Sequence, residues 1–310
     1  MKTGRHRAPG RRAVRPADVR PADVRPDCRV RGSHQRHPVA AGLGLLVVLA
    51  AFAGGLPGDV GPPPAREPGW TAAGVDQRYV LLRDGQVPTP ADGFFSWAAL
   101  NRRTGLLRGS ANLAAPSDTM SLVKAWLAAD DLRRSDEQGH LPRAPQLAQL
   151  SAMIRDSDNP AADATYARVG RRASIERMVD ICGLTDSAPE MNRWSNTVVS
   201  ARDLTRLGDC LANGHAAGPR WTPWLLGEMR AVRGEGDFGP RAALTPEYAA
   251  TIAIKNGWLL RDEDGLWHIS CLAIGETWVI AALARYPGER GLAYGAGFCR
   301  QIGAALLLVV

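Results

Sequence analysis

The chain of 310 residues is long enough to bury a substantial core in one large domain or two small ones. Its net charge of +7 comes from residues 1–37, where eleven Lys or Arg face three Asp and give +8. The remaining 273 residues therefore sum to −1, which argues against a nucleic-acid-binding groove in the main domain.

The N-terminal part of the chain has the pattern of an export signal. Residues 14–27 read VRPADVRPADVRPD, and proline at every fifth position excludes a helix, so we predict that residues 1–37 form a disordered basic leader. Residues 38–56 include an apolar run, 39–56, of eighteen residues without a charge. Such a run can be a signal peptide or a retained transmembrane anchor, and both alternatives stay open. The basic residues before it predict a cytoplasmic N-terminus and an extracytoplasmic main domain.

Four cysteines follow the apolar run: Cys182, Cys210, Cys271 and Cys299. An even number on the exported side indicates two disulfides, because oxidising compartments preserve them. Of the three possible pairings we favour Cys182–Cys210 with Cys271–Cys299, and four buried free thiols are the alternative. The Cys and His residues do not have zinc-type spacing.

Residues 57–75, rich in Pro and Gly, predict an extended linker that precedes a domain at 76–310. In that domain strands come first and last, with helices between. We expect a hairpin at 94–101 and 105–110, helices within 118–248, strands at 248–258, 266–274 and 277–286, and a final helix at 295–310. The predicted fold class is α/β (α+β): one antiparallel sheet built from both chain ends, with flanking helices and an inserted all-helical subdomain.

Lysine is rare in this chain: 35 of its 38 Lys and Arg are arginine, and Lys124 and Lys255 are the two lysines outside the leader. Arginine cannot lose its proton in a protein, whereas a desolvated lysine can become a neutral base. Ser121 lies three residues before Lys124, so the two share a helix face, and their apolar neighbours should lower the lysine pKa. A serine activated by a neutral lysine is a nucleophile for acyl transfer.

Two further motifs follow. Ser157-Asp158-Asn159 stands before a helix that we expect to start at Pro160, with Asn159 as a good N-cap. Lys255-Asn256-Gly257 ends an apolar strand, and the glycine would let a ligand backbone approach closely.

In this order, Ser-x-x-Lys, Ser-Asp-Asn and Lys-x-Gly resemble the three motifs of the serine penicillin-recognising enzymes, the superfamily of class A β-lactamases and D,D-peptidases. The resemblance covers residues from about 76 to the C-terminus and implies the same fold. It implies catalytic roles for Ser121, Lys124, Ser157 and Lys255, with Ser121 acylated, Lys124 taking its proton and Ser157 relaying a proton to the leaving nitrogen. It implies substrate binding by Asn159, Asn256, Gly257 and Trp258, with the backbone N–H groups of Ser121 and Trp258 as the oxyanion hole.

The resemblance also implies the partner: a small-molecule or peptidoglycan-derived acyl substrate, such as a peptide, an ester or a β-lactam. No metal or organic cofactor is expected. If residues 39–56 are retained, the membrane is a second partner.

Departures from the family pattern predict slow deacylation. Class A enzymes have a deacylating glutamate four residues before an asparagine. Counting back from Asn192 gives Ala188, and Glu190 is two residues away. Asn256 stands where the family has Thr or Ser. Two alternatives therefore remain beside a slow acyl enzyme: a β-lactamase with a non-standard base, and a non-catalytic cell-wall-binding or sensor domain.

Overall fold

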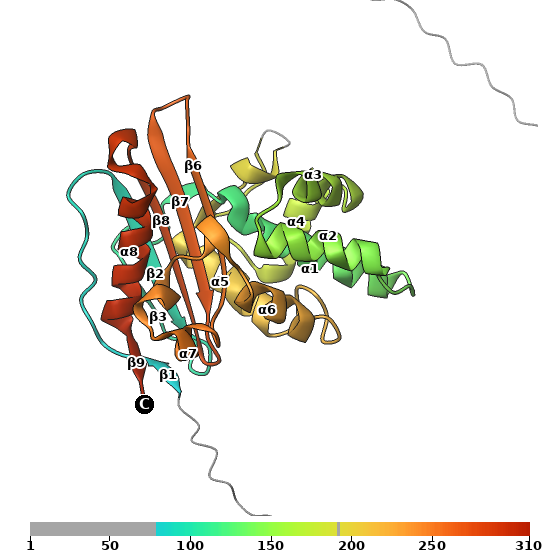
Figure 1. Ribbon diagram of the computed structural model, residues 1–310, viewed down its shortest axis with the longest axis horizontal. Helices are drawn as coiled ribbons and strands as arrows, with labels where there is room; N and C mark the ends of the chain where they lie inside the picture. Colours follow the sequence, from blue (N-terminus) through green and yellow to red (C-terminus); the bar gives the residue numbers. More distant parts are fainter. Residues whose placement is uncertain (1–78, 191–192) are drawn as a thin grey trace, which may run out of the picture. The chain divides into compact units, whose positions relative to one another are not determined.

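The computed structural model describes residues 79–190 and 193–310 (Figure 1). The expected leader, the apolar run at 39–56 and the linker at 57–75 lie outside the described residues. Among the helices in the described part of the chain, none has the length and apolar character needed to cross a membrane.

A five-stranded antiparallel sheet forms the centre of the domain, with strand order β3-β2-β8-β7-β6. Strands β2 (Phe94–Asn101) and β3 (Leu107–Gly109) come from the N-terminal side, and β6 (Ala253–Leu260), β7 (Leu266–Ile274) and β8 (Trp278–Pro287) come from the C-terminal side. The N-terminal and C-terminal parts of the domain are joined where β2 pairs with β8, from Phe94 opposite Arg285 to Asn101 opposite Trp278. The predicted sheet built from both ends of the domain is therefore confirmed.

Helices cover both faces of this sheet. In Figure 1, α8 (Gly291–Leu306) lies along one face, and α5 (Ala201–Ala212) lies on the opposite side with the rest of the helical region. Residues 278–284 of β8 are buried without alternation because each face of the strand meets a helix or a neighbouring element.

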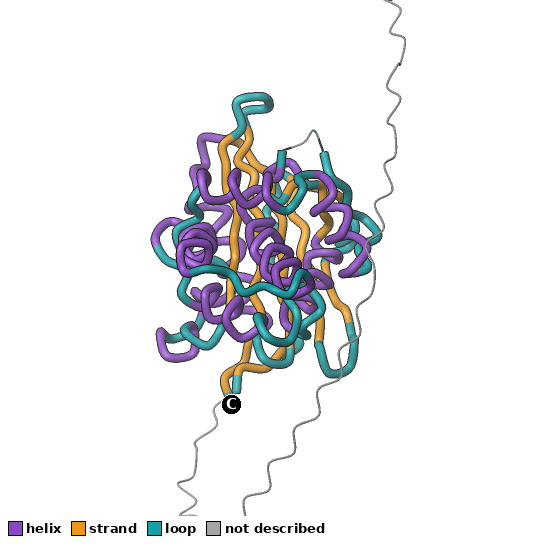
Figure 2. Tube along the Cα trace, turned by 90° about the vertical axis from the view of Figure 1, so that its right-hand side faces the viewer, coloured by secondary structure: helices purple, strands orange, loops and turns teal. Residues whose placement is uncertain are grey.

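The helical region comprises α5 and five further helices: α1 (Lys124–Glu137), α2 (Ala144–Arg155), α3 (Asn159–Arg168), α4 (Arg172–Cys182) and α6 (Thr222–Arg230). Figure 2 shows helices, in purple, in front of the orange strands. Helix α1 is the most enclosed, since residues 125–129 are all fully buried. A helix packed on every side gives the residues just before it a rigid support.

The structure corrects the bounds of several expected elements, including the strand expected at 277–286, which is β8 at Trp278–Pro287, and it adds two strand pairings. The strand expected at 248–258 begins at Ala253, because Pro246 starts the short helix α7 (Pro246–Ala249). The final helix runs over 291–306 rather than 295–310, and its last residues instead form β9 (Leu307–Val309), which pairs with β1 (Val80–Leu82). A second unexpected pairing joins β4 (Pro116–Asp118) to β5 (Val198–Ser200). The hairpin strand expected from 105 begins at Leu107.

Both favoured disulfides are confirmed. Cys182–Cys210 joins the end of α4 to α5, with Cα atoms 5.4 Å apart. Cys271–Cys299 joins β7 to α8, with Cα atoms 6.4 Å apart, and so fixes the C-terminal helix to the sheet.

Candidate active site

Ser121 lies in a 3₁₀ turn, Met120–Val123, that leads directly into α1. Met120 has a left-handed φ of 47°, which is unfavourable for a residue with a side chain and persists only where the surroundings fix it. Those surroundings are hydrogen bonds of Thr119: its N–H donates to the Thr197 carbonyl at 3.0 Å, and its carbonyl accepts from Ser270 Oγ at 2.6 Å. The turn is therefore anchored just before Ser121.

Gly257 lets β6 lie directly against this turn. A Cβ atom at Gly257 would be 2.4 Å from the Thr119 carbonyl oxygen and 2.6 Å from the Ser121 nitrogen. These separations are far below van der Waals contact, so glycine is required at this position. The close approach that we expected from a ligand is made by the chain's own backbone.

Lys124 is fully buried behind this turn. Its Nζ donates to the Ser157 carbonyl at 2.5 Å, to Asn159 Oδ1 at 2.6 Å and to Ser157 Oγ at 3.3 Å. Desolvation lowers the pKa of Lys124 to about 8, although the charges of Asp158 and Asp163 partly oppose that shift. The hydrogen bonds within the described residues do not include one between Lys124 Nζ and the Ser121 hydroxyl, which the spacing had put within reach.

The Ser157 hydroxyl lies between two buried amines. It accepts a hydrogen bond from Lys255 Nζ at 3.0 Å, in addition to the bond from Lys124. Ser157 itself has a left-handed φ of 57° at the entrance to α3. Desolvation, and then the charge of Lys124, holds the pKa of Lys255 well below its usual value. Two amines that are hard to protonate together can exchange a proton through the hydroxyl between them.

The expected N-cap of α3 was wrong. Asp158, not Asn159, is the cap, and its Oδ1 accepts from the Ala161 N–H at 2.7 Å. The helix begins one residue earlier than expected, at Asn159, whose side chain is thereby free to bind Lys124. Asp158 thus caps the helix, and Asn159 accepts a hydrogen bond from Lys124.

Asn256 is placed differently from the other motif residues. Its Nδ2 donates to the carbonyls of Gly236 (3.0 Å) and Phe238 (2.7 Å), and its Oδ1 accepts from the Leu272 N–H at 3.3 Å. The side chain is fully buried and does not line the cavity that contains Ser121. In the structure, the Asn256 side chain therefore connects β6 to the segment 236–238. Its expected contact with substrate stays a prediction.

Ser121 opens into a cavity of about 400 Å³. One wall is α3, which contributes Asn159, Asp163 and Tyr166, spaced at i, i+4 and i+7 on one helix face. Trp258 from β6 also lines the cavity. Of the predicted site residues, Ser121, Asn159 and Trp258 line it, while Lys124, Ser157 and Lys255 form the hydrogen-bonded network behind it.

Trp194 is a cavity residue that the sequence analysis did not identify. Lys124 Nζ lies 4.8 Å from the centre of its indole ring, and its Nε1 donates to Asp163 Oδ1 at 2.7 Å. Nothing in the local sequence distinguishes Trp194 from the other tryptophans, because its position depends on how the loop after α4 folds back. The indole ring of Trp194 therefore lies within cation–π distance of the Lys124 amine.

The two positions considered for a deacylating base lie elsewhere. Ala188 forms a backbone bridge with Val198, with N–O distances of 3.0 and 2.9 Å. Glu190 lines a separate cavity together with Arg261 and His268. Neither position lines the cavity of Ser121, where Asp163 is the carboxylate among the described lining residues.

A buried polar cluster supports the segment that leads to Ser121. His268 is buried between Asp118 Oδ1, at 2.7 Å from Nδ1, and Asp264 Oδ2, at 2.9 Å from Nε2. Arg261 also donates to Asp118. Burial alone would raise the pKa of Asp118 and is the largest single effect, but the hydrogen bonds and charges of His268 and Arg261 together outweigh it, so the pKa lies below its usual value. Asp118 precedes Ser121 by three residues, so this cluster fixes the strand that enters the turn.

Comparison with known sequences gives distant relatives. No family model matches the chain. Over 186 residues it is 30% identical to proteins of Mycobacterium tuberculosis and Mycobacterium bovis that are named as candidate lipoproteins, LppW. The match covers 58% of this chain, which thus spans 59% of the length of those curated relatives.

Comparison with solved structures finds proteins of the same fold at low sequence identity. A β-lactamase of Xanthomonas campestris matches with a TM-score of 0.53 and 19% identity, over 68% of this chain and 90% of its own. A β-lactamase of Chitinophaga pinensis matches with a TM-score of 0.54 and 16% identity, over 68% and 92%. The structure of PBP-A matches with a TM-score of 0.54 and 16% identity, over 72% and 97%. The chain therefore has the fold of the serine β-lactamase and D,D-peptidase superfamily, as its three motifs predicted.

Proposed function

We propose that the protein is an extracytoplasmic serine hydrolase or acyl-transferase that forms an acyl-enzyme at Ser121. The observation that supports this proposal most strongly is the network behind the cavity, in which the Ser157 hydroxyl connects two buried lysines of lowered pKa. Burying a lysine costs stability, and perturbed pKa values gather at catalytic sites.

Lys124 can act as a base once it is neutral. A neutral amine has two N–H donors, and the two shortest contacts of Nζ, to the Ser157 carbonyl and to Asn159 Oδ1, use both of them. Its lone pair then remains to accept the proton of the Ser121 hydroxyl. A pKa of about 8 puts the neutral form within reach near physiological pH.

Acyl transfer would then proceed in two steps. Ser121 Oγ bonds to the carbonyl carbon of the donor as its proton passes to Lys124, and the backbone N–H groups of Ser121 and Trp258 stabilise the oxyanion. The bond to the leaving nitrogen or oxygen breaks as the Ser157 hydroxyl supplies it with a proton, and Lys124 passes to Ser157 the proton that it took from Ser121, while Lys255 stays hydrogen-bonded to the same hydroxyl. The acyl donor would be a peptide, an ester or a β-lactam.

Deacylation is expected to be slow. The positions that could mimic the family's deacylating glutamate do not line the Ser121 cavity, and an indole lies beside Lys124. Asp163, the carboxylate in the cavity wall, is already bound by Trp194. Water activation at the acyl-enzyme therefore lacks a free base of the usual kind.

An extracytoplasmic location is supported by three features. The sequence has a basic leader followed by an apolar run, the domain contains two disulfides, and the mycobacterial relatives are named as candidate lipoproteins.

The test is intact-mass measurement of the full chain during incubation with benzylpenicillin, with Ser121→Ala as the control. A lasting adduct that the variant lacks supports the proposal. An adduct that disappears as the drug is hydrolysed would instead identify a β-lactamase with another base. Failure of both benzylpenicillin and a fluorophosphonate to label Ser121 would contradict a nucleophilic serine and favour a binding domain.

A further inference from the structure

The cavity of Ser121 is elongated along α3. Arg171, three residues beyond the end of this helix, lines the same cavity as Asn159 at its start. At a rise of 1.5 Å per residue, the ten residues of α3 separate these ends by about 15 Å. An extended chain of about four residues has that length, so the cavity is longer than the reacting bond alone requires.

Arg171 has a backbone conformation that side-chain-bearing residues rarely adopt, with φ of 53° and ψ of −121°. Such strain persists where the structure on both sides fixes the chain, and it is concentrated at functional positions. The Arg171 N–H donates to the Tyr166 carbonyl at 2.8 Å, which closes the turn between α3 and α4.

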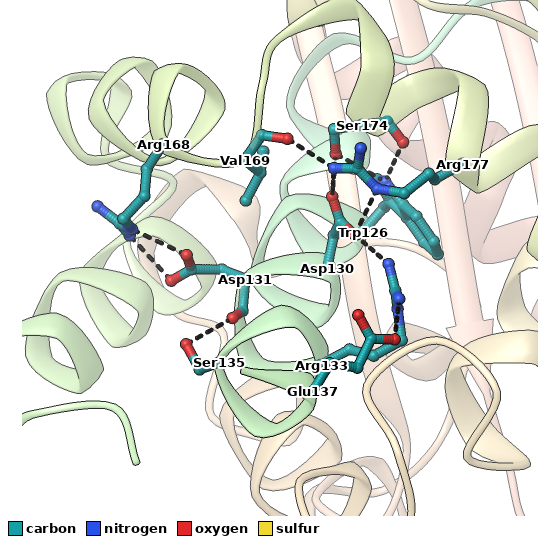
Figure 3. A network of polar contacts seen from close by, with 10 residues as sticks. All are labelled: Trp126, Asp130, Asp131, Arg133, Ser135, Glu137, Arg168, Val169, Ser174 and Arg177. Carbon is teal, nitrogen blue, oxygen red and sulfur yellow. Dashed lines mark hydrogen bonds and ion pairs between the residues drawn. The ribbon is translucent and has the colours of Figure 1, made fainter. Parts of the chain in front are cut away.

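Buried carboxylates of α1 hold the chain before Arg171 (Figure 3). Asp131 binds Arg168 through two hydrogen bonds of 2.8 and 2.9 Å. Arg177 donates to the Val169 carbonyl at 2.5 Å and is itself bound to Asp130, whose side chain is fully buried.

The same network holds the chain after Arg171. Ser174 Oγ donates to Asp130 Oδ2 at 2.6 Å, and Trp126 Nε1 donates to the Ser174 carbonyl at 2.9 Å. The turn is thus fastened on both sides of Arg171 to α1, the helix that begins with Lys124. Figure 3 shows these contacts converging from α1 on the residues that flank the turn.

The Arg171 side chain, in contrast, is exposed and forms no ion pair with a carboxylate of the described residues. Arg193, on the loop across from α3, also lines the cavity and is likewise unpaired among residues 79–190 and 193–310. The next residue along the chain behaves differently, since Arg172 binds Glu176 at 2.9 Å. A guanidinium that lacks a partner at a cavity wall is suited to a carboxylate.

The cavity lining contains one carboxylate, Asp163, and two guanidinium groups, Arg171 and Arg193, among the described residues. Asp163 lies between Asn159 and Arg171, bound to the Trp194 indole, so it repels an anion placed near Ser121. An anionic group on the donor is therefore favoured beyond Asp163, at the arginine end.

On the basis of the proposed acyl-enzyme function, we propose that the cavity binds an extended acyl donor that carries a carboxylate about four residues from the reacting carbonyl. Arg171 binds this carboxylate, and Arg193, which lines the same cavity, is a second guanidinium available to it. The natural donor would be an anionic peptide rather than a small neutral ester.

Two matched penicillins test this inference. The side-arm amine of ampicillin is extended by Gly-Gly and capped with succinyl in one probe and with succinamoyl in the other, so that the probes have the same length and differ only in a distal carboxylate against a neutral amide. Acylation rate constants are measured by intact mass on the full chain. We expect the succinyl probe to react about fivefold faster, because solvent-exposed ion pairs contribute modestly, and the preference should shrink in high salt.

Variants assign the preference to the side chain. Arg171→Gln should abolish it, and so should Arg171→Gly, which suits the left-handed φ and so guards against a folding defect. Arg172→Gln, the matched control, should retain it. Equal rates for the two probes in the wild-type chain would overturn the inference and leave the proposed function standing. Failure of both probes on a chain whose Ser121 is labelled by benzylpenicillin or a fluorophosphonate would overturn the inference alone, whereas failure of all four reagents would overturn the proposed function and the inference together.

Discussion

The contact between Gly257 and the nucleophile turn leads to a quantitative prediction for Gly257→Ala. The new methyl group would start 2.4 Å from the Thr119 carbonyl oxygen and 2.6 Å from the Ser121 nitrogen. Since ordinary contacts are about 3.5 Å, the turn and β6 must separate by about 1 Å. A displacement of this size at a reacting group costs on the order of 100-fold in rate, and overpacking costs about 1–3 kcal/mol of stability.

Gly297→Ala is the matched control. Gly297 lies in α8, where a Cβ atom meets no other atom within 4 Å, so its replacement should leave acylation unchanged and stabilise the fold by about 0.5–1 kcal/mol. The assay is the rate of penicillin acylation by intact mass, with the free energy of unfolding measured in parallel. Acylation of Gly257→Ala at the wild-type rate would refute the idea that the close approach of β6 positions Ser121.

Three further predictions concern charge and backbone. Because the pKa of Lys124 is lowered to about 8 and its neutral form is the base, the acylation rate should rise with pH through a midpoint near 8, and a flat profile between pH 6 and 9 would contradict this role. Asp130→Ala removes the buried partner of Arg177 and should lower the free energy of unfolding by about 3 kcal/mol in a denaturant titration; a loss below about 1 kcal/mol would show that the network is dispensable. Arg171→Gly should raise the free energy of unfolding by about 1 kcal/mol, because glycine relieves the backbone strain. A lower free energy of unfolding would show instead that the arginine side chain supports the fold.

The sequence predicted the features that depend on local pattern. The strands at 94–101 and 266–274 have the expected bounds because apolar runs bounded by turn residues define them. The scarcity of lysine located Lys124 and Lys255, and the structure brings both to the Ser157 hydroxyl.

Several other features, which depend on distant pairing, could not be predicted. The pairing of β1 with β9 joins the two ends of the domain, and no short window of sequence contains both partners. Trp194 and Arg171 reach the cavity because a loop and a turn fold back onto α3, and the turn at Arg171 is fixed by carboxylates on α1. Asn256 belongs to a motif by position, yet the main chain of 236–238 uses its side chain.

The central claim is that Ser121 is the nucleophile. Tryptic digestion of the full chain after penicillin treatment should release the peptide 109–124, which contains Ser110, Ser117 and Ser121. Tandem mass spectrometry of this peptide locates the added mass. We predict the penicilloyl group on Ser121, and an adduct on either of the other serines or on a different peptide would contradict the account.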